Sequence, residues 1–352
     1  MIDHFKPCIR AIGPPQAKIA FVGEAPGETE EQIGLPLVGA SGQEFTSMLQ
    51  DVGIERRHCY LTNVLFSRPP NNKLEAFLVP KGELPDGYSL PPILPALYLH
   101  PSLVQEVDRL RAELLALRPN LVVPLGNTAC WALLGRSRIS SIRGVVAEAS
   151  LLPGQKVLPT YHPAGVMRNW SWRVVVLQDL LKAKIEEEFP EIRRPERRLF
   201  IDPTLEEALS FLDSARSCPT LSCDIETAKG QITSIAFATQ RDLAMTIPFW
   251  DRRKDGWSYW TELEELTIWE LIAGLLSSHP RVLFQNGLYD VQYLWRIGIP
   301  VPGFSEDTML LHHSRFPELP KSLEFMGSIY TNERSWKSMR TQHGASDTKR
   351  EE

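Results

Sequence analysis

The stretch KIAFVGEAPG, residues 18–27, decides the fold expected for the first half of the chain. Its apolar run predicts a buried strand, which the following Gly and Pro residues end in a turn. Similar runs recur at residues 59–64, 120–126 and 156–163, with helical patterns such as residues 102–117 between them. Strands that alternate with helices predict an α/β domain with a doubly wound, mainly parallel sheet.

The second half of the chain has a different order of elements. Three strand-like runs, at residues 220–227, 231–240 and 243–250, lie close together and precede a helical pattern at residues 262–278 and a strand at residues 281–286. Short connections indicate antiparallel neighbours, and the later crossover indicates a parallel one. We therefore expect a second α/β domain with a mixed sheet of the ribonuclease H type.

Composition places the boundary between these two domains. Residues 189–198 belong to a charged, proline-containing stretch with little apolar periodicity, which is typical of a solvated linker. We expect a first domain over residues 1–188, a second over residues 199–338 and a polar, disordered tail over residues 339–352. The proline-rich residues 69–101 are expected to form a long irregular loop.

Overall charge and cysteine content limit the classes of function. The chain has 352 residues, a formal net charge of −5 and five cysteines without a CxxC pair. It has no N-terminal apolar segment and no run of about 18 apolar residues, so we expect reduced thiols and no membrane partner. Because affinity for phosphate comes largely from clustered Lys and Arg, the net charge excludes a nonspecific DNA coat.

Two carboxylates share one side of the strand LSCDIET. Asp224 and Glu226 are two residues apart, so both side chains point to the same face. Such a like-charged pair is costly on a half-buried strand unless a cation such as Mg²⁺ or Mn²⁺ compensates it. Asp290 follows a later strand and is expected to point back at this pair. The arrangement is suited to two-metal hydrolysis of a phosphodiester, and a pair of exposed strand-end charges is the alternative.

The blocks DIET, QNGLYD and EDTMLLHHSRFPELPKSLEFMGSIYT resemble, in this order, the exonuclease domain of phage-type family A DNA polymerases over residues 199–337. The resemblance implies a DEDD-type 3′–5′ exonuclease. Its catalytic metal ligands would be Asp224, Glu226 and Asp290. Its nucleic-acid contacts at the strand end would include Asn286 and Tyr289.

The third motif of that exonuclease family, a Tyr or His followed by an Asp on a late helix, has no clear counterpart. His343 and Asp347 have a similar spacing but lie in the polar tail. The motif is therefore supplied by the tail, by a separate polymerase chain, or not at all. Asp307 matches a family position near the site, and it is equally suited to cap a helix. A noncatalytic DNA-binding or polymerase-assembly module is an open alternative.

Polar residues follow four strands of the predicted first sheet. Glu24 and Asn63 end the first two strands, and Asn127 and His162 follow later ones. Because ligands of open α/β sheets bind outside the carboxyl ends of the strands, these residues are expected to converge on one pocket. An Asn can read a pyrimidine edge, and a His can stabilise charge on a base oxygen as a glycosidic bond breaks. Taken singly, each is better explained as a cap, turn or loop residue.

The segments GEAPG with GLPLVGASG, YLTNVLFSRPPNN, LVVPLGNTA and YHPAG together resemble the uracil-DNA glycosylase superfamily (family 4) over residues 8–185. The resemblance implies a glycosylase-like pocket with three catalytic residues, Glu24, Asn63 and His162. Nucleic-acid contacts would come from Gly23, Gly27 and Leu37.

Two departures from that superfamily affect the expected cofactor and substrate. Cys8 stands alone, Ser67 replaces a usual ligand Cys and no Cys lies near His100, so no iron–sulfur cluster is expected. Leu37 replaces an aromatic residue that stacks on the extruded base, so stacking is expected to be weaker.

The two resemblances together are those of the N-terminal part of certain phage family A DNA polymerases. They imply a DNA-processing protein of phage replication or repair, located in the cytoplasm of a bacterial cell or a phage-infected host. The leading hypothesis is a metal-dependent exonuclease acting on single-stranded 3′ ends, with a first domain that binds DNA or surveys bases. The alternative is excision of uracil from DNA as the main activity.

Overall fold

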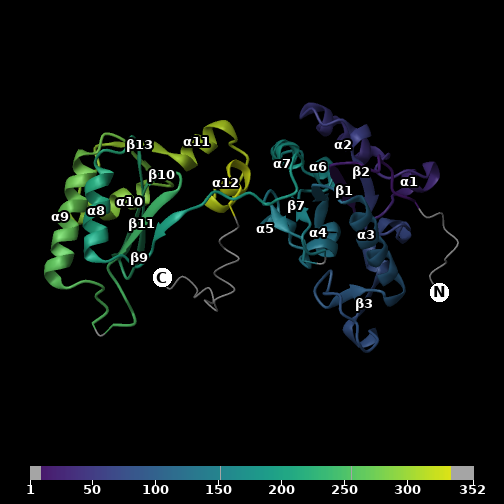
Figure 1. The fold of residues 1–352 in the computed structure, drawn as a ribbon, viewed down its shortest axis with the longest axis horizontal. Helices are drawn as coiled ribbons and strands as arrows, with labels where there is room; N and C mark the ends of the chain where they lie inside the picture. Colours follow the sequence, from purple (N-terminus) through teal and green to yellow (C-terminus); the bar gives the residue numbers. More distant parts are fainter. Residues whose placement is uncertain (1–8, 151, 255, 334–352) are drawn as a thin grey trace. The chain divides into compact units, whose positions relative to one another are not determined.

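The computed structural model describes residues 9–150, 152–254 and 256–333. The chain divides into two compact units, each an α/β arrangement around its own sheet (Figure 1). The first unit consists of two segments of the chain, one ending at Arg193 and one beginning at Glu324. The second unit is Arg194–Leu323. In the described part of the chain, no helix combines the length and apolarity needed to cross a membrane.

A five-stranded sheet in the order β2-β1-β5-β7-β6 forms the centre of the first unit. Its strands are β1 (Ile19–Gly23), β2 (Tyr60–Asn63), β5 (Leu121–Pro124), β6 (Ala147–Glu148) and β7 (Lys156–Val157). β1 pairs in parallel with β2 and β5, β5 pairs in parallel with β7, and the edge strand β6 is antiparallel. The predicted mainly parallel, doubly wound sheet is confirmed.

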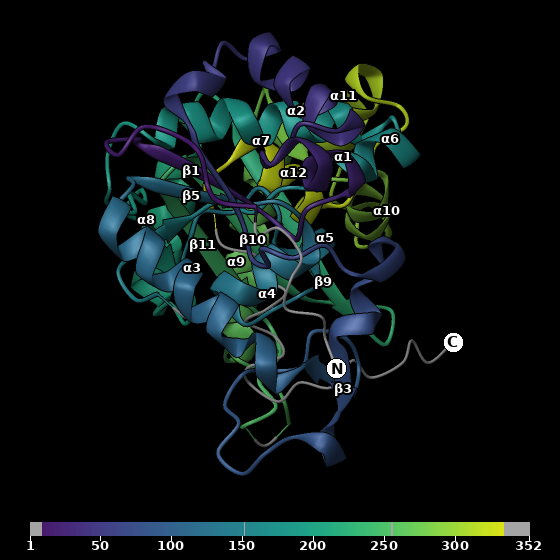
Figure 2. The same cartoon turned by 90° about the vertical axis from the view of Figure 1, so that its right-hand side faces the viewer.

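Helices cover both faces of this sheet, with α2, α6 and α7 on one side and α3 and α4 on the other (Figures 1 and 2). The helices are α1 (Glu28–Ile33), α2 (Ala40–Asp51), α3 (Val104–Leu117), α4 (Gly126–Leu134), α5 (Ile139–Ile142), α6 (Pro163–Arg168) and α7 (Trp172–Glu186). Because both faces are covered, every residue of β1 is buried. This explains why the strand is a continuous apolar run in the sequence.

Residues 69–101 are more ordered than the long irregular loop expected from their prolines. They contain short 3-10 turns at Pro70–Asn72, Leu74–Phe77 and Lys81–Glu83, and a small antiparallel sheet of β3 (Leu78–Pro80) and β4 (Leu97–Leu99). Phe77, Ile93 and Leu99 are buried in the core of the first unit. The expectation was wrong because a few widely spaced apolar residues anchor the segment.

A six-stranded mixed sheet in the order β13-β12-β9-β10-β11-β8 forms the centre of the second unit. Its strands are β8 (Arg198–Phe200), β9 (Leu221–Ala228), β10 (Gln231–Gln240), β11 (Leu243–Pro248), β12 (Val282–Phe284) and β13 (Phe304–Asp307). β10 pairs antiparallel with β9 and β11, whereas β12 pairs in parallel with β9 and β13. This is the expected ribonuclease H-type order.

The helices of the second unit are α8 (Leu205–Ala215), α9 (Glu262–Ser278), α10 (Leu288–Arg296) and α11 (Thr308–Arg315). α8 and α9 lie side by side (Figure 1) and contribute Leu212 and Ile272 to the core. Each begins with a capping box, in which a Thr side chain and a Glu three residues later satisfy the first main-chain N–H groups. These caps fix where both helices start.

Residues 324–333 pack in the first unit rather than in the second. They include most of α12 (Leu323–Tyr330), whose Met326 and Ile329 are buried. The expected extension of the second domain to residue 338 is therefore wrong at its C-terminal end. An apolar helix face can pack on either core, so the sequence pattern alone could not identify its partner.

Hydrogen bonds from α7 and the segment before β6 hold this returning segment, residues 324–333. Lys182 Nζ donates to the carbonyl oxygens of Gly144, Ser328 and Thr331, at 2.7, 2.7 and 2.8 Å. Arg143 Nη1 donates to the Ser328 hydroxyl at 2.9 Å. The returning segment is thus a bound part of the first unit.

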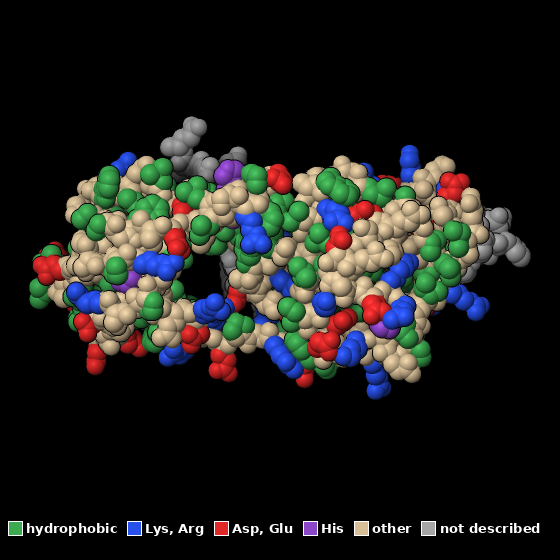
Figure 3. Space-filling view, turned by 90° about the horizontal axis from the view of Figure 1, so that it is seen from above, with side chains coloured by type: hydrophobic (Ala, Val, Ile, Leu, Met, Phe, Trp, Pro, Cys, Tyr) green, Lys and Arg blue, Asp and Glu red, His purple; other side chains and the backbone are tan. Residues whose placement is uncertain are grey.

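Charged side chains of both signs occur on the face of the molecule seen in Figure 3. On the face shown in Figure 3, Lys and Arg side chains are interspersed with Asp and Glu side chains. No broad patch of one sign is visible on that face. This mixture agrees with the expectation that contacts to a polyanion are local.

Replacing Lys182 by Ala is expected to destabilise the first unit by about 2 kcal/mol, because three carbonyl groups lose a charged hydrogen-bond donor. Calorimetric unfolding of the full chain measures the effect. Lys18→Ala is the matched control, since the Lys18–Glu188 ion pair is exposed on both sides and contributes little. Equal effects of the two substitutions would contradict a stabilising role for the returning segment.

Candidate functional sites

The parallel strands bring three of the predicted residues to one edge of the first sheet. Glu24 directly follows β1, Asn63 ends β2, and His162 comes after β7. The register of β1 and β2 places Gly23 beside Asn63. These side chains therefore lie where ligands of open α/β sheets bind.

The side chain of Asn63 is tightly constrained. It is 2% exposed, and its Nδ2 has no hydrogen-bond partner among the described residues. Its Oδ1 lies so close to Gly23 that a Cβ there would be 2.3 Å away. Arg109 Nη2 fixes the strand end by donating to the carbonyls of Asn63 and Val64 at 2.8 and 2.9 Å. Since an unpaired buried amide costs roughly 1–3 kcal/mol, Nδ2 is an unsatisfied donor at this strand end.

His162 is held as a neutral imidazole. It is the N-cap residue of α6, and its Nδ1 accepts a hydrogen bond from the main-chain N–H of Ala164 at 3.1 Å. Burial lowers the pKa of His162 to about 4, with a further decrease from Arg168 and an opposing effect of Glu30. With Nδ1 as the acceptor, the proton is on Nε2, which is the donor left for a ligand.

Two acidic residues shape the loops at this edge. Glu24 accepts a short hydrogen bond from the hydroxyl of Thr128, which is buried on α4. The buried carboxylate of Glu30 accepts from three main-chain N–H groups, those of Gly27, Val38 and Gly39, at 3.2, 3.0 and 2.8 Å. Sequence reasoning missed Glu30, since the N-cap of α1 is Gly27, which lacks the side chain of a capping-box sequence, and only the bond from Gly27 N–H to Glu30 forms.

Three of the predicted residues are engaged within the protein. The N–H of Gly27 donates to Glu30 and is not free for a ligand. Leu37 is 5% exposed, so its side chain offers no stacking surface in this arrangement. The Oδ1 of Asn127 accepts from the main-chain N–H of Ile139 at 3.0 Å, which holds the start of α5. The structure thus keeps Glu24, Asn63 and His162 at the sheet edge. Gly27, Leu37 and Asn127 are instead engaged or buried within the protein.

A second group of predicted residues lies on β9 and α10. Asp224 and Glu226 are on the exposed face of β9, whereas Cys223 and Ile225 are buried. Asp290, in the first turn of α10, is buried, and its Oδ1 accepts from the main-chain N–H of Ile225 at 2.9 Å. The structure therefore brings all three carboxylates to one strand.

Burial and, to a smaller extent, like charge raise the pKa of two of these carboxylates. Partial burial and the charge of Glu226 raise the pKa of Asp224. The pKa of Asp290 is raised to about 6, chiefly by burial, while the N–H of Ile225 opposes the increase and Asp224 adds to it. A divalent cation would relieve this repulsion, and carboxylate oxygens are suitable ligands. Among the described residues, no three His, Cys, Asp or Glu side chains form a ready metal-binding group, so the metal stays a prediction.

Asp307 organises the turn next to these carboxylates. Its side chain caps α11 and also accepts from the main-chain N–H groups of Asn286 and Gly287 at 3.1 and 2.8 Å. Asn286 takes a left-handed backbone conformation with φ of 58°. Tyr289 is 44% exposed, and its hydroxyl is 2.5 Å from that of Thr227. Asp307 thus acts as a helix cap that also positions the residues framing the strand end.

Some residues weighed from the sequence lie outside the described part of the chain. These are Cys8, His343 and Asp347. Ser67 is half-buried after β2, and the Nδ1 of His100 lies 2.8 Å from the hydroxyl of Ser102 at the start of a 3-10 turn. The late exonuclease motif therefore stays a prediction.

Comparison with known proteins gives a family match for the first unit. The model of the uracil DNA glycosylase superfamily matches residues 11–188. The chain is 33% identical over 169 residues to a type-4 uracil-DNA glycosylase of Thermotoga maritima, which covers 47% of this chain and 76% of that protein.

Matches that reach beyond the first unit are weaker. A DNA polymerase of Bacillus phage SP01 is 24% identical over 229 residues, or 63% of this chain, and the chain spans only 22% of that polymerase. The exonuclease domain of Nibbler from Aedes aegypti aligns with a TM-score of 0.31 and 14% identity, over 46% of this chain and 80% of that domain. Likeness at this level assigns no activity.

The buried acid Asp290 is expected to make stability depend on pH. Its pKa of about 6 in the folded state lies above the ordinary 3.8, so its stabilising contribution is complete below pH 3.8 and is lost as pH rises through 6. Asp290→Asn keeps the Oδ1 acceptor without the charge. It should therefore raise the melting temperature in EDTA above pH 6, by an amount that shrinks toward pH 4.

Thermal unfolding of both proteins between pH 4 and pH 8 measures this difference. Asp213→Asn is the control, because its side chain is 86% exposed and should shift the melting temperature little at any pH. A difference for Asp290→Asn that does not vary with pH would contradict the raised pKa.

Proposed function

The chain belongs to the uracil DNA glycosylase superfamily through residues 11–188, and on that premise we propose that its first unit excises uracil from DNA. The observation that carries the proposal is the buried, unpaired Nδ2 of Asn63 at the sheet edge that also carries His162. An amide N–H donor suits a carbonyl acceptor on the edge of uracil, whereas cytosine presents an amino donor at the equivalent position.

The proposed reaction is hydrolysis of the glycosidic bond of an extruded nucleotide. As the bond between C1′ and the base breaks, its electron pair moves onto the base, and the Nε2–H of His162 stabilises the charge on a base oxygen. A neutral imidazole can do this without giving up its proton. The carboxylate of Glu24, held by Thr128, orients the water that bonds to C1′ and takes its proton.

Uracil excision is expected to depend on Asn63 and His162. With an oligonucleotide that contains one uracil, Asn63→Ala and His162→Gln should each lower kcat/KM about 100-fold or more, because one donor to the base is lost. The rate should be unaffected by EDTA. It should not fall through titration of His162 between pH 7 and 5, since this residue has a pKa of about 4.

Alkali-labile strand breaks at the uracil provide the measurement. Asn127→Ala is the matched control, because this Asn bonds to the main chain of Ile139. A wild-type protein without breaks, or an Asn63→Ala variant with full activity, would rule out the proposed role.

A metal-dependent 3′–5′ exonuclease in the second unit is the second candidate function. The supporting observation is that Asp224, Glu226 and Asp290 lie at one strand, where Glu226 repels Asp224 and Asp224 repels Asp290. A cation would relieve this repulsion. The match to a phage DNA polymerase spans 63% of this chain, which is longer than residues 11–188 that the glycosylase family model matches. Bound Mg²⁺ or Mn²⁺ would generate hydroxide and stabilise the leaving oxygen. The substrate would be single-stranded DNA with a free 3′ end.

Degradation of a 5′-labelled single-stranded oligonucleotide tests the exonuclease. We expect a ladder with Mg²⁺, none with EDTA, and loss of at least about 1000-fold in Asp224→Ala, because a metal ligand is removed. Mn²⁺ should also raise the melting temperature of wild type but not of Asp224→Ala. Asp213→Ala on α8 is the surface control. Absence of both the ladder and the metal-induced stabilisation would leave the second unit as a noncatalytic DNA-binding or polymerase-assembly module.

A further inference from the structure

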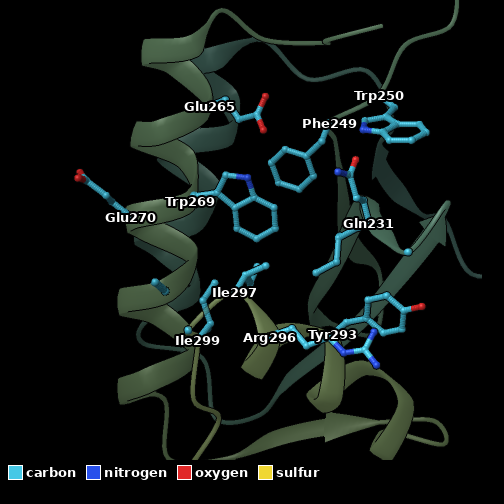
Figure 4. Close-up of a pocket in the computed structure, with 14 residues that line it drawn as sticks. Gln231, Phe249, Trp250, Glu265, Trp269, Glu270, Tyr293, Arg296, Ile297 and Ile299 are labelled. Atoms are coloured by element: carbon cyan, nitrogen blue, oxygen red, sulfur yellow. The ribbon is translucent and has the colours of Figure 1, made fainter.

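A cavity of about 560 Å³ in the second unit plays no part in either proposed reaction (Figure 4). It lies between α9, the end of α10 and the start of β10. Two of its lining residues, Phe249 and Trp269, stack on each other with ring centroids 4.2 Å apart and ring planes at an angle of 9°. Phe249 is buried and Trp269 half-buried, so the pair forms a rigid aromatic wall.

Polar groups are distributed unevenly around this wall. Arg296, at the end of α10, is exposed, and its guanidinium carbon lies 5.0 Å from the ring centroid of Tyr293. The carboxylate of Glu265 points toward the cavity from α9, whereas that of Glu270 points away (Figure 4). Gln231 adds an exposed amide from β10. The cavity thus has an acidic side at α9 and a basic side at α10.

Helix α10 connects this cavity with the carboxylates of the proposed exonuclease. Asp290 is in the first turn of that helix, and Tyr293 lies one turn further along. The rings of Tyr289 and Tyr293 have centroids 5.0 Å apart, and the Tyr289 hydroxyl reaches Thr227 on β9. A row of aromatic side chains therefore runs from the end of β9 to the cavity.

We propose that this cavity binds one nucleotide of a single-stranded DNA, with the base against Trp269 and Tyr293 and a phosphate at Arg296. Its volume lies within the range of small-ligand pockets, roughly 300–1,000 Å³. Stacking of bases on aromatic rings is tolerant of sequence, and a guanidinium pairs with phosphate. The acidic side repels phosphate, so the nucleotide has one favoured orientation, with its base toward α9.

The orientation has a consequence for base preference. Glu265 accepts hydrogen bonds, so a base with an exocyclic amino group is favoured over thymine. The side chains of an apolar peptide segment would form no hydrogen bond with Glu265, Gln231 or Arg296. The nucleotide bound in the cavity and the substrate of the proposed exonuclease are both single-stranded DNA. Binding in the cavity requires no hydrolysis, so either proposal can be wrong while the other holds.

Photo-crosslinking of the full chain tests the proposal. The probe is an octamer of deoxyadenosine with one 8-azidoadenine, used in EDTA, and the adducts are mapped by mass spectrometry. We expect adducts on the cavity residues Trp269 and Tyr293, and a decrease of at least about fivefold in Tyr293→Ala and Arg296→Ala. Arg296 is exposed, so its substitution should leave the fold intact. An octamer of thymidine should compete at least about threefold more weakly than one of deoxyadenosine.

The matched control is Trp295→Ala on the same helix, whose side chain is 65% exposed and does not line the cavity. It should crosslink as wild type does. Adducts found only outside the cavity, or equal losses in Arg296→Ala and Trp295→Ala, would overturn the proposal. Asp224→Ala should retain the crosslink, so loss of the exonuclease ladder in that variant leaves the nucleotide site supported.

Discussion

The parallel register of β1 between β2 and β5 is the constraint on which the first unit depends. It aligns Gly23 with Asn63 and Val22 with Pro124, so the strands end at a common edge. Polar groups at that edge lie beyond the strand pairing and need other hydrogen-bond partners. Arg109 uses the carbonyl of Asn63, and Asn63 itself keeps an unpaired amide. The main chain at this edge is therefore held in place while the Asn63 amide still lacks a hydrogen-bond partner. A fixed donor of this kind suits recognition of a flat polar ligand.

In the second unit, the short pairing of β12 with β9 determines where Asp290 lies. β12 pairs with β9 at Leu221 and Ser222, so the N–H of Ile225 further along β9 is left for the side chain of Asp290. The buried carboxyl is thereby drawn toward the strand whose exposed face carries Asp224 and Glu226. The electrostatic consequence of this burial, with a smaller contribution from Asp224, is a raised pKa of Asp290, which the hydrogen bond from Ile225 opposes. A cation would reverse that consequence, because it would favour the charged form of each carboxylate.

The returning segment reaches the His162 loop of the first unit through a buried ion pair. Ser328 accepts from Arg143, which pairs with Asp179, and Asp179 accepts from the hydroxyl of Thr160 at 2.7 Å. Thr160 lies two residues before His162. Buried ion pairs often add little net stability, but they favour one arrangement because breaking one partner leaves a buried charge. The C-terminal part of the chain thus contributes to the order of a loop that is distant in sequence.

Apolar periodicity by itself determined both sheets, the helix over residues 262–278 and the shared face of Asp224 and Glu226, because these depend on neighbours along the chain. Strand ends also drew attention to Glu24, Asn63 and His162, which follow β1, end β2 and follow β7. Only the tertiary structure decided the roles of Glu30 and Arg109 and the internal partners of Gly27 and Asn127. It alone also decided the return of residues 324–333 to the first unit. These features depend on which groups meet across long separations in the chain, and local pattern carries no information on such encounters.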